Sequence, residues 1–124
     1  MAVPTTDRDL LSFISSSFRS VWALELVLLL KAENRAWTRG ELVEALRASD
    51  LVVGNALEAL VAGGMVSMDE HAASYMPVND QIAGCLAEVE KLYRSKPDAV
   101  RRVIISASAS SASAFANAFK LRKD

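Results

Sequence analysis

The stretch TRGELVEALRASDLVVGNALEALVAGGMVSMDEHAASYMPV, residues 38–78, decides the fold of this chain. Thr38 and Glu41 have the spacing of a capping box, in which each side chain accepts a hydrogen bond from the other residue's backbone amide. After a short turn, Ser49 and Asp50 mark the start of a second helix. Apolar residues at helical spacing define the inward faces of the two helices: Leu42, Ala45 and Leu46 in the first, and Val53, Ala56, Leu57 and Leu60 in the second.

The end of this stretch predicts a small hairpin. Gly63-Gly64 ends the second helix, because glycine adopts the left-handed cap conformation at least cost. Residues 65–68 and 74–78 then form two short strands around a loop at 69–73. Before the first helix, Trp37 lies either on a short first strand or at the end of the core.

Further helices are predicted on both sides of this unit. Residues 7–18 have apolar side chains at helical spacing behind a Thr6 cap, and residues 20–30 are apolar nearly all round, as in a central buried helix. Residues 80–93 predict a long helix, and Pro97 suits the first turn of another.

The chain is therefore predicted to be a single domain over residues 1–124. An N-terminal helix occupies residues 1–19, the helix-turn-helix and hairpin core occupies 20–78, and C-terminal helices occupy 79–124. A Ser/Ala connector at 106–113 separates the last two helical segments.

Composition agrees with a globular domain. The 124 residues are 52% hydrophobic, enough to bury a core without cross-links. Cys85 and His71 are the single residues of their types, too few for a structural zinc site, which usually takes four ligands. The apolar run 21–30 is interrupted by Glu25 and spans about half of the ~20 residues that cross a bilayer. The first residues lack a signal-peptide pattern, so we expect a cytoplasmic protein without metal, cofactor or membrane contact.

Charge is distributed unevenly although the formal net charge is only -1. Residues 1–37 carry four basic and four acidic side chains and are neutral. Residues 38–78 carry two basic and six acidic side chains, a net of -4, whereas residues 79–124 carry eight basic and five acidic ones, a net of +3. The helix-turn-helix unit is thus acidic, and the excess of basic side chains lies in the C-terminal part.

Residues 49–66, with Gly64-Met65-Val66 leading into a hairpin that closes on Tyr75-Met76-Pro77, resemble the winged helix-turn-helix regulators of the MarR and ArsR type. The resemblance covers about residues 20–78. It implies a mainly α fold with a β-hairpin wing, in which the second helix enters the DNA major groove and the wing contacts the neighbouring backbone. Residues 92–97 and 115–124 also resemble segments of small, largely uncharacterised alphaproteobacterial winged-helix proteins.

The resemblance implies a DNA-binding transcriptional regulator. On the outward face of the second helix, Asn55 is the residue that can make a bidentate contact with adenine. The candidate phosphate partners are Arg19, Arg35, Arg39 and Arg47. The second helix itself contains no Lys or Arg, and Asp69 and Glu70 stand where the wing of the family commonly has basic residues.

A non-catalytic protein-interaction module is the alternative. The outward positions Leu51, Val52, Ala59 and Ala62 form a smooth surface without charge, which suits another protein better than phosphate. The same surface would also suit packing against the chain's own C-terminal helices.

The sequence predicts no catalytic residue. Cys85 falls on the apolar face of its helix, as a buried inert thiol does, and the Ser-rich tract has no neighbouring base to activate a hydroxyl. We therefore expect a protein that is not an enzyme.

A homodimer is expected through the N-terminal and C-terminal helices, as in regulators of this type. The apolar residues Leu11, Phe13, Phe115 and Phe119 are the candidates for the dimer contact. Completion of a monomeric core by the same residues is the other possibility.

Overall fold

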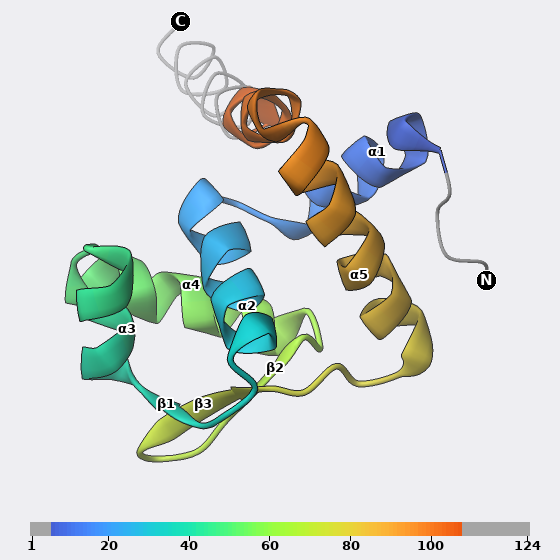
Figure 1. The fold of residues 1–124 in the computed structure, drawn as a ribbon. Helices are drawn as coiled ribbons and strands as arrows, with labels where there is room; N and C mark the ends of the chain where they lie inside the picture. The colour runs from blue at the N-terminus through green and yellow to red at the C-terminus, as the bar shows by residue number, and fades with distance from the viewer. Residues whose placement is uncertain (1–5, 108–124) are drawn as a thin grey trace, which may run out of the picture.

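The computed structural model of the chain describes residues 6–107. They form a mainly helical fold with a small three-stranded antiparallel sheet, as the sequence predicts (Figure 1). In chain order the elements are α1 (Asp7–Ser17), α2 (Val21–Ala32), β1 (Trp37–Thr38), α3 (Arg39–Leu46), α4 (Asp50–Ala62), β2 (Val66–Met68), β3 (Ala72–Tyr75) and α5 (Asp80–Ser95). Residues 97–107 continue as a further helix.

Each of the helices α1 to α5 begins at a side-chain cap. The side chains of Thr6, Ser20, Thr38, Ser49 and Asn79 accept hydrogen bonds from the first-turn amides. At α3 the complete capping box is present, with the Thr38 amide donating to Glu41 Oε1 at 2.9 Å. Each such cap stabilises its helix by roughly 1 kcal/mol. The residues at the start of each helix therefore help to determine where it begins.

The first two helices are separate elements. α1 ends at Ser17, followed by the buried C-cap residue Phe18, and α2 begins after the Ser20 cap, with an angle of 105° between the two helices. Within the described residues no single helix is long and apolar enough to cross a membrane, and only α1 and α2 taken together reach that length and composition.

The sheet has the strand order β1-β3-β2, so the hairpin β2–β3 is joined by β1 on its other edge. Trp37 meets both expectations, since it pairs with Ala73 as part of β1 and is also buried in the core. The second hairpin strand was predicted at 74–78 but spans Ala72–Tyr75. The Asp69 carboxylate accepts from the amides of His71 and Ala72, both at 2.8 Å, so the turn is tight and strand pairing resumes earlier.

The core surrounds α2, which packs against α3, α4 and β3 and lies between the α3–α4 pair and α5 (Figure 1). All four predicted inward residues of α4 are buried, namely Val53, Ala56, Leu57 and Leu60. On α3 the prediction for Ala45 is wrong, because Ala45 is exposed. The helix turns Leu42 fully inward with Val43 and Leu46 half-buried beside it, and this places Ala45 at the rim.

The C-terminal part packs back onto α1. α5 lies against α1, and the Lys96 ammonium pairs with the Asp7 carboxylate at 2.7 Å. In the following helix Val100 and Ile104 are buried, as expected. This helix includes residues 106 and 107, so the connector predicted at 106–113 does not begin where expected. The rest of that connector and the predicted helix around Phe115 and Phe119 lie outside the described residues.

Candidate functional site

A groove of about 830 Å³ runs between α4 and the corner where α1 meets α2. α4 forms one wall, and the end of α1 and the start of α2 form the other. Its principal lining side chains are Phe13, Trp22, Val52, Asn55, Ala59 and Ala62. This volume lies within the range of small-molecule and peptide sites, so the groove is the main candidate site in the described part of the chain.

Apolar side chains form the larger part of the lining of this groove, together with three serines of the α1–α2 corner and Asn55. Val52, Ala59 and Ala62 contribute short side chains from α4, and Trp22 contributes an indole ring that is 38% exposed. Glu58 and Arg19 supply the charged groups of the lining. Of the residues predicted for a protein interface, Val52, Ala59 and Ala62 are therefore brought together, whereas Leu51 is 70% exposed and lies outside the lining.

Arg39 connects α3 to the start of α4. Its Nε lies 2.8 Å from Asp50 Oδ1, and its Nη2 donates to the Asp50 carbonyl at 2.9 Å. The guanidinium covers Gly54, where an added Cβ would overlap it. Arg39 thus already has a structural role in holding α3 against the start of α4.

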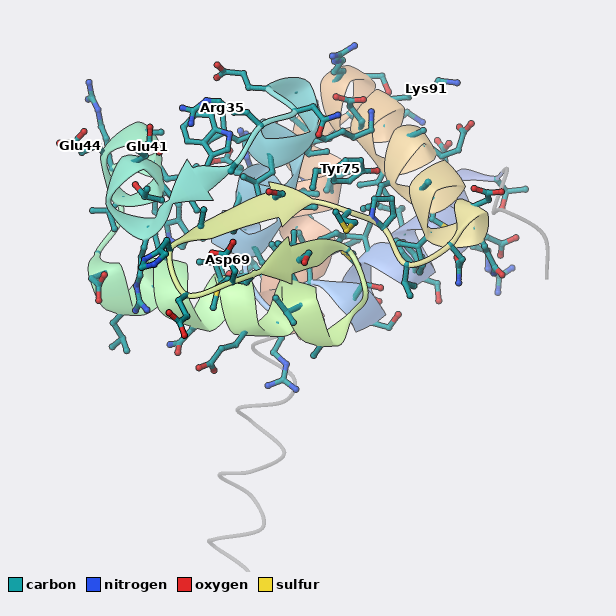
Figure 2. All side chains as sticks on the ribbon, turned by 90° about the horizontal axis from the view of Figure 1, so that it is seen from below. Arg35, Glu41, Glu44, Asp69, Tyr75 and Lys91 are labelled. Carbon is teal, nitrogen blue, oxygen red and sulfur yellow. The ribbon has the colours of Figure 1, made fainter. Side chains whose placement is uncertain are left out.

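Arg35 is also engaged in local contacts. Its guanidinium lies over the Trp37 ring, with Cζ 3.8 Å from the centroid, and Nη2 lies 3.3 Å from Glu41 Oε2. Figure 2 shows Arg35 and Glu41 on neighbouring segments beside the sheet. The Thr38 amide, and after it the Arg35 side chain, lowers the pKa of the Glu41 carboxyl. Arg35 therefore supports the start of α3.

The remaining DNA-contact candidates lie in two places. Asn55 and Arg19 line the groove. Arg47 lies at the end of α3 in the left-handed conformation with φ 53°, exposed. Among residues 6–107 the Arg47 guanidinium has no ion-pair or hydrogen-bond partner. The five predicted residues thus divide between the groove, the α3–α4 turn and local structural contacts.

The expected dimer residues of α1 contribute to the chain's own packing. Leu11 and Phe13 are partly buried against the core, and the Phe13 and Phe18 rings meet edge to face with centroids 6.5 Å apart. Phe13 also lines the groove.

A polar network between α2 and α5 was not predicted from the sequence. The Tyr93 hydroxyl donates to Glu25 Oε1 at 2.9 Å and accepts from Arg101 Nε at 3.2 Å. Burial, and after it the Glu25 hydrogen bond, raises the pKa of the Tyr93 phenol. The sequence feature that indicates this network is Glu25, because a carboxylate within an apolar helix needs a hydrogen-bonding or charged partner.

Cys85 and Asp69, the other polar residues considered, contribute to packing and to the hairpin turn. Cys85 is buried as predicted, and burial raises the pKa of its thiol. The backbone amides of His71 and then Ala72 lower the pKa of the Asp69 carboxyl, which organises the hairpin turn. Within residues 6–107, no three side chains of histidine, cysteine, aspartate or glutamate lie close enough together to hold a metal ion.

No protein-family model matches the chain, and neither a curated protein nor a solved structure does.

Proposed function

We propose that the chain is a non-catalytic protein-binding module of the winged-helix type, with the groove beside α4 as its binding surface. The observation that carries this proposal is the groove of about 830 Å³, where α4 presents the small apolar side chains of Val52, Ala59 and Ala62, with Asn55 and Glu58 among them, opposite Trp22. Interface cores are depleted in charge and enriched in aromatic residues, and a partly exposed Trp within a concave site is a common energetic anchor.

The winged-helix type is supported by connectivity. α3 and α4 are joined by a short turn, and the β2–β3 hairpin follows directly. β1, immediately before α3, completes the sheet at the other edge of β3. This order corresponds to that implied by the resemblance of residues 20–78 to MarR and ArsR regulators.

The charges favour a protein over a nucleic acid as the partner. Proteins that bind DNA neutralise several phosphates with Lys and Arg side chains. α4 has no Lys or Arg and carries Asp50 and Glu58, within a unit of net charge -4. Arg35 and Arg39 are already paired with carboxylates. A neutral or basic apolar segment therefore fits this surface better than a duplex.

Two substitutions in the same turn of α4 test the groove. Ala62 lines it, whereas Val61, also exposed, does not. In a capture experiment with the full chain as bait, Ala62→Glu is expected to lose the retained partner, because a charge enters an apolar contact surface, while Val61→Glu retains it. Equal capture of a specific partner by both variants would contradict the proposal.

DNA binding is the second candidate, and the exposed Arg47 at the turn before α4 is the observation that favours it. An arginine that has no partner within residues 6–107 is available for a phosphate at this turn. If the chain binds DNA, its retention on a duplex should weaken as the salt concentration rises, and Arg47→Ala should be retained less strongly than the wild-type chain. Retention that does not change between low and high salt would reject it.

A further inference from the structure

We infer that the groove beside α4 is the docking site of the chain's own C-terminal segment, residues 114–121, within the same molecule. The inference rests on the proposed function, since it takes the groove to be a protein-binding surface, and it names the occupant. An external partner would then have to displace this segment.

The described chain ends next to a wall of the groove. Four residues of the last helix border a small hollow together with Ser15 of α1, namely Arg102, Val103, Ser106 and Ala107. Ser16 and Ser17, the next residues of α1, line the groove. Seven residues, 108–114, lie between Ala107 and Phe115, so the Cα atoms of these two residues are at most about 29 Å apart. A tether this short gives its segment a high effective concentration at a neighbouring site.

The segment has the side chains that this groove suits. Phe115 and Phe119 are four residues apart, the spacing that places two rings on one face of a helix. Ala114 and Ala118 beside them are small enough to allow close approach. The groove offers the short side chains of α4 on one wall and the Trp22 ring on the other, a setting in which aromatic rings pack well.

Charge also favours this occupant. Residues 108–124 carry three basic side chains, Lys120, Arg122 and Lys123, against the single acid Asp124. The groove itself is lined by one acid, Glu58, and one base, Arg19, whereas residues 38–78, which include its α4 wall, carry a net charge of -4. The basic side chains that follow Phe119 are therefore attracted to the acidic unit around the groove.

Trp22 provides a direct probe in the full-length chain. The sequence has two tryptophans, of which Trp37 is 5% exposed in the core while Trp22 lies in the groove. Acrylamide quenching of tryptophan fluorescence measures how far the Trp22 ring is covered. A Trp22→Phe chain supplies the signal of Trp37 alone, which is subtracted.

The test compares two double variants that add the same charge at the same spacing. Phe115→Asp/Phe119→Asp removes both rings, and Ser113→Asp/Asn117→Asp places two aspartates on the opposite helical face. Loss of two buried phenylalanines is expected to lower the docked-to-free ratio about a hundredfold or more. Trp22 quenching then rises in the first variant and stays at the wild-type level in the second. Adding a synthetic peptide of residues 108–124 to the first variant restores the shielding.

Three results would overturn the inference. Trp22 quenching could be unchanged in Phe115→Asp/Phe119→Asp, or it could rise equally in both double variants. Shielding lost on dilution of the wild-type chain would instead assign the groove to the segment of a second copy. None of these results affects the comparison of Ala62→Glu with Val61→Glu in partner capture, so failure of this inference and failure of the proposed function are distinguishable.

Discussion

Both sides of α4 carry apolar residues, but only one side is covered by other elements. On one side Val53, Ala56, Leu57 and Leu60 are each at most 4% exposed beneath α2, α3 and the sheet. On the other side Val52, Ala59 and Ala62 line an open groove, and Leu51 is 70% exposed. Residue type alone therefore does not separate the core side from the binding side, because neighbouring elements decide which side is covered.

The largest expected effect is a difference in the free energy of unfolding between substitutions on the two sides of α4. Leu57→Ala removes a side chain that is 2% exposed, so we expect the free energy of unfolding to fall by about 3 kcal/mol. Leu51→Ala, the same change on the open side, is expected to alter it by less than about 0.5 kcal/mol. Urea denaturation monitored by circular dichroism measures both. Equal losses would show that the open side is covered in solution.

The covered part of the molecule also depends on a polar contact, between α2 and α5. Tyr93→Phe removes the hydroxyl that joins Glu25 to Arg101 and is expected to cost about 1 kcal/mol near neutral pH.

The pH dependence of this contact has a definite sign. Burial and the Glu25 hydrogen bond raise the pKa of the folded-state phenol above its ordinary value of 10.0. The stability that Tyr93 contributes is therefore complete below pH 10 and is lost as the pH rises through the folded-state pKa. The wild-type chain should lose stability above pH 10 more steeply than Tyr93→Phe, in thermal unfolding across that range. Parallel curves would contradict the role of this hydroxyl.

Gly54 lies at the boundary between the two sides and offers a smaller test. Gly54→Ala gains about 1 kcal/mol of helix propensity but displaces the Arg39 guanidinium from Asp50, a partly exposed pair worth less than about 1 kcal/mol. We expect little net change in the wild-type chain and a gain of about 1 kcal/mol in an Arg39→Ala background. Denaturant unfolding of the four chains measures this coupling, and additive effects would argue against the contact.

The covered side of α4 was predictable because its information is local. The spacing of Val53 to Leu60 and the caps at Thr38 and Ser49 predicted the helices that are found. The groove was not predictable in full, because its second wall comes from the α1–α2 corner. Trp22 lies in a run that is apolar nearly all round, so periodicity could not show which residues face solvent. Glu25 and Tyr93 are 68 residues apart, a pairing that follows only from the packing of α5.

The smallest expected effect distinguishes two parts of the open side of α4, the first turn and the groove. Leu51 lies in the first turn of α4, outside the groove. A negative charge near a helix N-terminus is stabilising by about 0.3–1 kcal/mol at exposed sites. Leu51→Asp should therefore unfold at slightly higher urea concentration than wild type, and Leu51→Lys at slightly lower. Neither should change capture of the partner that Ala62→Glu loses, because the groove is intact. Loss of capture in both Leu51 variants would extend the binding surface beyond the groove to the first turn of α4.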